Sequence, residues 1–299
     1  MITMYDKSSI CAIIVTFNIG KDLFKCFDSV KDQVNEVVIV DNGSNQETTV
    51  ILNEMEKNEK VKVIYNGVNL GIAFALNQGV KYAINKGYDW VLTLDHDSKV
   101  TPGMIDKMLS AYNKLSNNEK NSTFIIVPRH VEERFYRNID INDQLKPAFV
   151  ITEITSGSLV KTDAYRQVGF YDEKLFIDYV DHEFCLRLKK YKKKILYVPT
   201  AILLHNLGTV QVGNFLNKKV TYTNHSYLRR YYITRNRIYV WTKYLTIAPR
   251  WVIKDIVGFL KEIIKIVLYE NDKKRKFKMI FKGITDSVKG NFGKINMEG

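Results

Sequence analysis

The chain contains few cysteines, prolines and glycines. Its 299 residues include three cysteines, five prolines and 16 glycines, whereas 45% are hydrophobic and 26% are charged. This balance excludes collagen-like, low-complexity and wholly disordered proteins. Because Cys11, Cys26 and Cys185 are odd in number and widely spaced, we expect neither a disulfide framework nor a zinc knuckle, and we expect a reducing, cytoplasmic location.

Long uninterrupted hydrophobic runs are also lacking. The first run, residues 10–17, is not followed by a small-residue cleavage site, so we expect no signal peptide. The longest later candidate, residues 251–269, is interrupted by five charged side chains, namely Lys254, Asp255, Lys261, Glu262 and Lys265. These charges argue against a simple membrane span, and we expect a chain that is soluble or lies on a surface.

Acidic residues are scarce in the last third of the chain. Residues 1–200 contain 26 basic and 26 acidic residues, whereas residues 201–299 contain 19 basic and 6 acidic residues, which accounts for the net charge of +13. We therefore predict a first domain over residues 1–215 and a basic helical region over residues 216–299. A basic region of this kind favours an anionic partner, either nucleic acid or a membrane face.

Short β-branched runs alternate with helical patterns in the first domain. The expected strands cover residues 10–17, 36–40, 61–65 and 90–94. Helical spacing of Leu23, Phe24, Phe27 and Val30, a polar segment through Met55, and residues 71–86 indicate the helices between them. Strands joined by such long crossovers predict an α/β, Rossmann-like fold, with a mainly parallel sheet flanked by helices.

Polar residues follow each of these four strands. Ligands bind beyond the carboxyl ends of the strands in such sheets. At these positions the sequence has Thr16–Asn18, Asp41–Ser44, Asn66–Gly71 and Asp95–Asp97. Each of these segments, taken alone, is typical of an ordinary turn. Their recurrence after successive strands favours a binding site at one rim of the sheet.

Asp95 and Asp97 give the sharpest local signal. Two carboxylates at a strand end can share one hard divalent cation, Mg²⁺ or Mn²⁺, which also binds substrate phosphates. The alternative is a solvated acidic turn before a helix that begins at Thr101-Pro102, since threonine is a common N-cap and proline a common first residue. The position of the pair directly after the fourth strand favours a metal site over a solvated turn.

Several motifs occur in the order and spacing of a known family. They are Val15-Thr16-Phe17-Asn18, Val40-Asp41-Asn42-Gly43-Ser44, Asn69-Leu70-Gly71, Leu92 to Ser98, Thr155 to Leu159, Gly169 to Glu173 and Phe176 to Arg187. Over residues 8–240 the chain resembles the inverting family 2 glycosyltransferases of GT-A fold. With Tyr231-Tyr232, Arg235-Asn236-Arg237 and Phe281-Lys282-Gly283, it is similar to the bacterial rhamnosyltransferases that use dTDP-rhamnose.

The resemblance implies a role for each matching position. The nucleotide-sugar donor, a dTDP- or UDP-sugar, would bind within about the first 100 residues of the catalytic domain, and the acceptor would bind beyond them. The implied donor-binding residues are Thr16, Asn18, Asp41, Asn69, Gly71, Asn77 and Asp95. Mg²⁺ or Mn²⁺ would be held by Asp95 and Asp97. His205 either completes this metal site, contacts the diphosphate, or is an ordinary structural histidine. His96 should point away from the two aspartates.

The resemblance also implies that Asp181 is the general base. The helical spacing of the residues that follow puts Asp181 in the first turn of a helix, where the positive end of the helix dipole keeps its carboxylate ionised. The family has a glutamate before this aspartate, but Val180 stands there, so Asp178 or Glu183 could be the base instead. Glu183 and Arg187 are four residues apart and should form a pair on a solvated helix face.

The implied activity is an inverting sugar transfer. The sugar, rhamnose from dTDP-rhamnose, would go to a saccharide or polyprenyl-linked acceptor in the synthesis of a bacterial surface polysaccharide, either O-antigen or capsule. Two other classes share some of these features. A sugar nucleotidyltransferase also has paired aspartates on an α/β fold, and a noncatalytic module could use the basic third to bind an anionic surface.

The basic third contains an amphipathic pattern. An apolar stripe runs from Val252 to Leu268, and the cluster Lys273-Lys274-Arg275-Lys276 follows it. This pattern favours an interfacial helix that docks on the anionic inner face of a membrane through residues 250–290. The alternative is a helix packed on the catalytic domain or on the second subunit of a homodimer. Because the first two thirds describe an enzyme, we expect no nucleic acid as a partner.

Overall fold

The computed structural model describes residues 9–138, 145–205, 211–215 and 218–296. The chain divides into two compact units. The first contains Met1–Glu173 and Val180–Asn206, and the second contains Lys174–Tyr179 and Leu207–Gly299.

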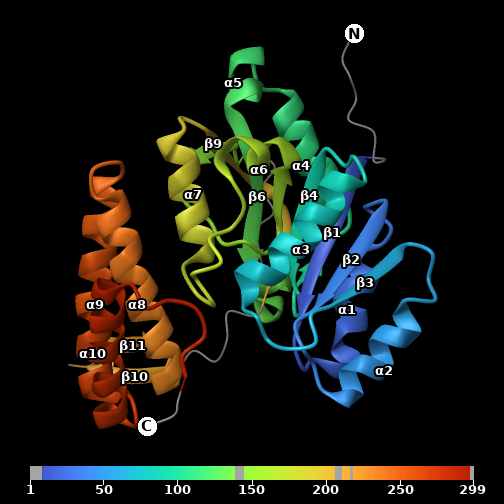
Figure 1. Cartoon of the computed structure of the whole chain (residues 1–299). Helices are drawn as coiled ribbons and strands as arrows, with labels where there is room; N and C mark the ends of the chain where they lie inside the picture. The colour runs from blue at the N-terminus through green and yellow to red at the C-terminus, as the bar shows by residue number, and fades with distance from the viewer. Residues whose placement is uncertain (1–8, 139–144, 206–210, 216–217, 297–299) are drawn as a thin grey trace. The chain divides into compact units, whose positions relative to one another are not determined.

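The first half of the first unit confirms the predicted alternation of strands and helices. Strands β1 (Ile10–Thr16), β2 (Glu36–Asp41), β3 (Val61–Tyr65) and β4 (Trp90–Asp95) alternate with η2 (Gly20–Asp22), α1 (Leu23–Val30), α2 (Gln46–Met55) and α3 (Ile72–Asn85) (Figure 1). β1 pairs in parallel with both β2 and β4, and β2 pairs in parallel with β3. Every residue of β1 is buried, which explains its continuous apolar run.

The rest of the first unit makes the sheet mixed. It comprises β5 (Lys99–Val100), α4 (Met104–Asn113), α5 (Asn117–Ser122), β6 (Thr123–Val131), η3 (Glu133–Asn138), β7 (Ala148–Val150), β8 (Ser158–Lys161), α6 (Thr162–Val168), α7 (Val180–Lys190) and β9 (Lys194–Leu204). Among the described residues, nine strands form one sheet in the order β3-β2-β1-β4-β8-β6-β9-β5, with β7 paired to β9. β8 runs antiparallel to β4 and β6, whereas β6 and β9 are parallel.

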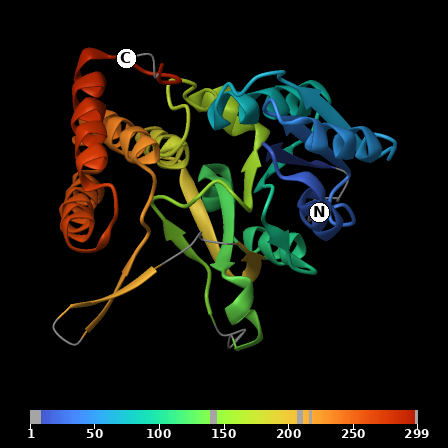
Figure 2. The same cartoon turned by 90° about the horizontal axis from the view of Figure 1, so that it is seen from below.

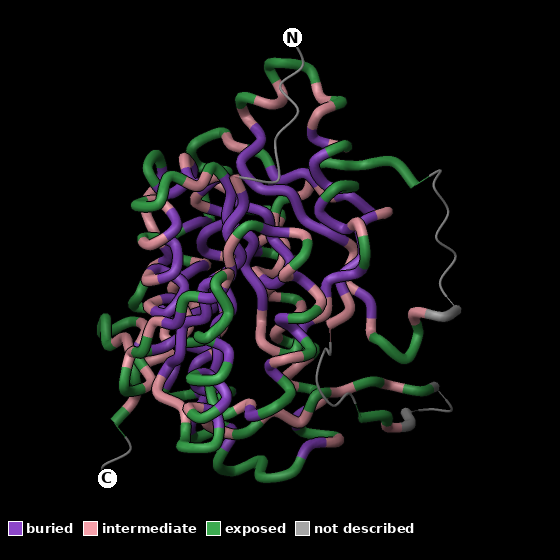
Figure 3. Tube along the Cα trace, turned by 90° about the vertical axis from the view of Figure 1, so that its right-hand side faces the viewer, coloured by how far each residue is buried: buried purple, intermediate pink, exposed green. Residues whose placement is uncertain are grey.

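Helices cover both faces of the sheet. On one face, α1, α2 and α4 pack against Ile10, Ala12 and Ile14 in a continuous apolar cluster. On the other face, α3 lies against β1 and β2. It comes so close that a Cβ atom at Gly79 would lie 2.6 Å from Ile13 Cγ2. Figure 3 shows the buried residues of the sheet in purple. The packing of helices on both faces holds the strand ends in fixed positions.

The helix after Asp95 and Asp97 begins later than predicted. It starts at Met104, behind Gly103 in a left-handed conformation (φ 69°). The hydroxyl of Thr101, the predicted N-cap, instead donates to the Ile202 carbonyl oxygen of β9 at 2.6 Å. The prediction was wrong because this long-range hydrogen bond fixes Thr101 beside β9.

The described part of the second unit contains helices and a hairpin. They are α8 (Tyr227–Tyr244), α9 (Pro249–Tyr269), α10 (Lys273–Lys289), β10 (Gln211–Phe215) and β11 (Lys218–Tyr222) (Figure 2). α8 and α10 pack closely because Gly283 has no side chain, and a Cβ atom there would lie 2.8 Å from the Tyr231 carbonyl oxygen. Among the described helices, none has the length and apolar character needed to cross a membrane.

The segment Lys174–Tyr179 is held by the second unit. Asp178 and Tyr179 have φ values of 64° and 66°, which are unfavourable for residues with a side chain. The Asn236 amide of α8 donates to the carbonyl oxygens of Ile177 (2.8 Å) and Asp178 (3.0 Å). These hydrogen bonds offset part of the cost of the left-handed pair.

The ion pair between Glu183 and Arg187 in α7 is buried, so the predicted solvated pair was wrong. The two side chains are 0% and 15% exposed and lie 2.6 Å apart. Arg187 also donates to the carbonyl oxygens of Val168 (3.0 Å) and Phe170 (2.7 Å). The spacing predicted the pair correctly, but it carried no information about the segment that covers this face of the helix.

We predict that Glu183→Ala lowers the free energy of unfolding by about 3 kcal/mol, because it leaves the Arg187 charge buried without its carboxylate. Urea denaturation followed by circular dichroism measures the loss. The control is Asp28→Ala, which removes an exposed pair with Lys31 and should cost less than about 1 kcal/mol. Equal losses in the two variants would contradict this account.

Candidate active site

The carboxyl ends of β1, β2 and β4 meet at one rim of the sheet. In the parallel register, Thr16 lies beside Asp41, and Val15 lies beside Asp95. Because β1 is the central strand of the three, residues distant in sequence come together at successive rungs. Of the predicted site residues, Thr16, Asp41 and Asp95 are brought together in this way.

Asp41 is fixed in a tight turn. It is 3% exposed, and its carboxylate accepts hydrogen bonds from the backbone N–H groups of Gly43 (3.3 Å) and Ser44 (3.2 Å). Gly43 has φ 82°, and a Cβ atom there would lie 2.5 Å from the Val68 carbonyl carbon. Since a carboxylate has about four acceptor positions, Asp41 can still accept from a ligand.

Asn18 joins the loop after β1 to the start of α2. Its backbone N–H donates to Ser44 Oγ at 3.0 Å, and its Oδ1 accepts from the Asn45 N–H at 2.7 Å. Asn45 in turn caps α2. The predicted donor-binding residue therefore shapes the rim through the adjacent turn.

Asn69 and Gly71 lie in the loop before α3. Asn69 Oδ1 accepts from the Asn42 side-chain amide at 3.1 Å and from the Gly71 N–H at 3.0 Å. Gly71 has φ 94° at the N-cap of α3, which favours a residue without a Cβ atom. These contacts tie the loops after β2 and β3 together.

The side chain of Asn77 forms hydrogen bonds within the protein. It is buried, its Nδ2 donates to the Tyr171 carbonyl oxygen (3.0 Å) and to Glu173 Oε1 (2.8 Å), and its Oδ1 accepts from the Tyr171 N–H (2.9 Å). The structure thus assigns Asn77 to the positioning of residues 171–173. Its role in donor binding stays a prediction.

The Thr16 hydroxyl is a buried polar group at the end of β1. Within the described part of the chain, its Oγ1 has no hydrogen-bond partner. A buried hydroxyl that lacks a partner costs free energy. Its place beside Asp41 marks a position where a ligand could supply the hydrogen bond.

Asp95, Asp97 and His205 form the group that could hold a metal ion. One ligand atom from each residue lies within 4.8 Å of the other two. His205 Nε2 is 4.0 Å from Asp95 Oδ2, and His205 Nδ1 is 3.7 Å from Asp97 Oδ1. Two carboxylate oxygens and one imidazole nitrogen fit Mg²⁺ or Mn²⁺, with other positions left for water or phosphate. His96 is outside this group.

The Asp95 carboxyl group is in an environment that resists its negative charge. Desolvation raises its pKa above the ordinary value, and the carboxylates of Asp97 and Asp181 add to the rise, whereas His205 and His96 oppose it. A cation at this position would remove the electrostatic penalty. The same interaction indicates that Asp181 lies within electrostatic range of the metal group.

Two serines that sequence reasoning left without a role connect this group. Ser156 Oγ accepts from the Asp95 N–H at 3.0 Å and lies 2.7 Å from Ser98 Oγ, which is 2.9 Å from His205 Nδ1. The hydroxyls fix the imidazole relative to Asp95. Both serines lie in motifs that are typical of the family, and their place in these motifs could have indicated a role in the site.

His130 was missed by sequence reasoning. Its Nε2 is 2.8 Å from the Ser156 carbonyl oxygen, and its ring lies 6.3 Å from the His205 ring. Burial lowers the pKa of His130, with a smaller contribution from His205. The His130 imidazole therefore supports the Ser156 segment, and no sequence pattern around His130 indicated this contact.

Asp181 lies in the first turn of α7, as predicted. It is half-buried, and its Oδ1 accepts from the His182 N–H at 2.7 Å. The two alternative bases are held in ion pairs, Asp178 with Arg229 at 3.1 Å and Glu183 with Arg187 at 2.6 Å. These pairs favour Asp181 among the three carboxylates.

Two solved structures with a similar fold contain a nucleotide or nucleotide sugar together with Mn²⁺. A crystal structure of GalNAc-T7 with UDP, GalNAc and Mn²⁺ has a TM-score of 0.58 at 17% identity, and the match covers 79% of this chain and 48% of that one. The mannosyltransferase PcManGT from Pyrobaculum calidifontis, with GDP-Man and Mn²⁺, has a TM-score of 0.57 at 13% identity, with 96% and 88% covered. At such identities these likenesses establish the GT-A fold.

Sequence comparison identifies the family, whereas the structural comparison identifies the fold alone. A dTDP-rhamnosyl transferase, RfbF of Shigella flexneri, is 32% identical over 245 residues, which cover 77% of this chain and 79% of the relative. The family model described as glycosyl transferase family 2 matches residues 11–168, the segment that carries β1 to β4 and both aspartates of the metal group. With its rim of carboxylates on a GT-A sheet, the chain belongs to glycosyl transferase family 2.

Proposed function

We propose that this protein transfers L-rhamnose from dTDP-rhamnose to a hydroxyl group of a saccharide or polyprenyl-linked saccharide, with inversion at the anomeric carbon. The observation that carries the proposal is the 32% identity with a dTDP-rhamnosyl transferase over 77% of the chain. The product would enter a bacterial surface polysaccharide, O-antigen or capsule. A cytoplasmic location stays a prediction, which the buried free cysteines support.

Donor binding is proposed for the rim. Asp41 would accept hydrogen bonds from the base or from sugar hydroxyls, and the buried Thr16 hydroxyl would find its partner there. Gly71 would let the backbone approach the nucleotide. Asn18 and Asn69 would act from the loops that they hold together.

Asp95, Asp97 and His205 are the proposed ligands of Mg²⁺ or Mn²⁺. The bound metal ion would neutralise negative charge on the leaving diphosphate. If His205 Nδ1–H donates to Ser98, its Nε2 keeps a lone pair for the metal. The hydroxyl pair Ser98–Ser156 would then set both the tautomer and the direction of the ring.

The proposed reaction is a single displacement. The acceptor oxygen forms a bond to the anomeric carbon as the bond from that carbon to the diphosphate oxygen breaks, and Asp181 takes the proton from the acceptor hydroxyl. Attack from the side opposite the leaving group inverts the configuration. The electrostatic effect of Asp181 on the pKa of Asp95 is consistent with a base that acts beside the donor.

We predict that Asp181→Asn lowers kcat by about 10²–10⁴-fold, because the variant lacks the general base. Initial rates with dTDP-rhamnose and a saccharide acceptor measure the effect. Asp178→Asn and Glu183→Gln, checked for folding by circular dichroism, serve as comparisons and should retain more activity. Full activity in Asp181→Asn would assign the base elsewhere.

We predict that Asp97→Ala weakens Mn²⁺ binding at least about tenfold, because one ligand of the metal group is lost. Isothermal titration with MnCl₂ provides the measurement. Asp32→Ala, which removes a carboxylate that is 80% exposed, should bind Mn²⁺ as the unmodified protein does. Chelation with EDTA should stop turnover and added Mn²⁺ should restore it, and turnover that persists in EDTA would exclude metal dependence.

Donor choice is tested with a panel of nucleotide sugars. Incubation with Mn²⁺ and a saccharide acceptor should release dTDP faster from dTDP-rhamnose than UDP from UDP-sugars, with a rhamnosylated product detected by mass spectrometry. Transfer from a UDP-sugar, with none from dTDP-rhamnose, would support the glycosyltransferase activity but contradict the proposal that rhamnose is the transferred sugar.

A further inference from the structure

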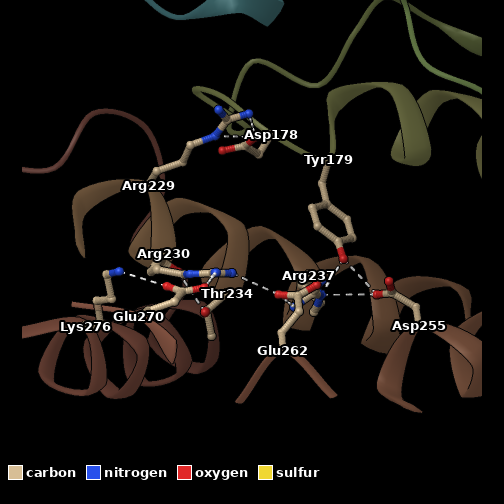
Figure 4. A network of polar contacts seen from close by, with 10 residues as sticks. All are labelled: Asp178, Tyr179, Arg229, Arg230, Thr234, Arg237, Asp255, Glu262, Glu270 and Lys276. Carbon is tan, nitrogen blue, oxygen red and sulfur yellow. Dashed lines mark hydrogen bonds and ion pairs between the residues drawn. The ribbon is translucent and has the colours of Figure 1, made fainter. Parts of the chain in front are cut away.

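Helix α9 is oriented with its acidic face toward the rest of its unit. Glu262 accepts from Arg230 at 3.1 Å and from Arg237 at 2.8 Å, and Asp255 accepts from the Trp241 indole N–H at 2.7 Å. All three donors belong to α8. Figure 4 shows Glu262 and Asp255 of α9 turned toward the arginines of α8. Ion pairs and hydrogen bonds thus fix the rotation of α9 about its own axis.

The apolar face of α9 is consequently turned outward. At about 3.6 residues per turn, a residue nine positions before Glu262 lies on the opposite side of the helix. The exposed apolar residues of this face are Ile253 (57%), Val257 (44%), Leu260 (56%), Ile264 (57%), Val267 (48%) and Leu268 (47%). A surface helix normally buries its apolar stripe against its own domain, so this face is suited to contact outside the chain.

Helix α10 repeats the pattern. Phe277, Phe281 and Val288 occur at spacings of four and seven residues, and their exposed fractions are 36%, 69% and 78%. The opposite side of α10 packs on α8 through Met279 and Gly283. The unit therefore exposes apolar stripes on two consecutive helices.

The charge at the edge of the α9 stripe specifies the partner. Lys254, Lys261 and Lys265 occur at spacings of seven and four residues along one side of the stripe, and Lys254 and Lys261 are exposed. The acidic residues of α9 are Asp255 and Glu262, and both are already bonded to α8. The partner must therefore supply negative charge together with an apolar interior.

We propose that the outward face of α9 docks on an anionic lipid bilayer. The apolar stripe would enter the boundary between headgroups and acyl chains, and the lysines would contact lipid phosphates. A second copy of the chain fits less well, because an antiparallel contact of two α9 faces would bring lysines of like charge together without acidic partners. This docking does not depend on the proposed sugar transfer.

Vesicle sedimentation tests the proposal with the full-length protein. The protein should bind vesicles of phosphatidylcholine that contain phosphatidylglycerol, and binding to vesicles of phosphatidylcholine alone should be at least about tenfold weaker. Added NaCl should weaken the binding, since salt screens the lysines. Absence of binding to the anionic vesicles would overturn the proposal.

Matched variants locate the surface. Leu260→Glu/Ile264→Glu should reduce vesicle binding at least about tenfold without changing the circular dichroism spectrum, because both side chains are exposed. Val50→Glu alters an apolar residue of α2 that is 54% exposed and should bind as before. Equal binding by the α9 variant would overturn the proposal, as would a dimer in analytical ultracentrifugation that dissociates in this variant.

Discussion

The hydrogen-bond ladder that pairs β1 with both β2 and β4 is the constraint on which the candidate site depends. It sets Thr16 beside Asp41 and Val15 beside Asp95. A slip of one residue in either pairing would turn every side chain of a strand to the opposite face. Because helices cover both faces of these strands, such a slip would disrupt the packing on both faces and displace the polar residues at the strand ends. The apolar residues of the strands thus decide where the carboxylates lie.

The two units balance charge in different ways. At the rim of the first unit, Asp95 and Asp97 gather around one imidazole, and their mutual repulsion favours a divalent cation. In the second unit, the arginines of α8 lie among the carboxylates of Asp255, Glu262 and Glu270 and form ion pairs with them. Negative charge is therefore concentrated at the rim of the first unit, whereas carboxylates offset the buried arginines of the second.

The sequence predicted those features that depend on nearest neighbours along the chain. Apolar runs predicted β1 to β4 because burial on both faces leaves a continuous pattern, and Asp95 was expected at the rim because it directly ends β4. Features that depend on distant contacts were missed. Thr101 is fixed by Ile202, and the buried Glu183 pairs with Arg187, which also donates to the Val168 carbonyl oxygen. His130 lacked any local signal, since its contact with Ser156 forms through the fold.

The course of the chain between the units has a consequence for its evolution. Residues 174–179 belong to the second unit although residues on both sides belong to the first, and Phe176 stacks on Tyr232 of α8 with ring centroids 5.2 Å apart. Cutting the chain after residue 206 would leave this segment without the helix that supports its left-handed residues. The C-terminal helices are therefore no detachable appendage. A shorter relative without them would need a different sequence at the entry to α7.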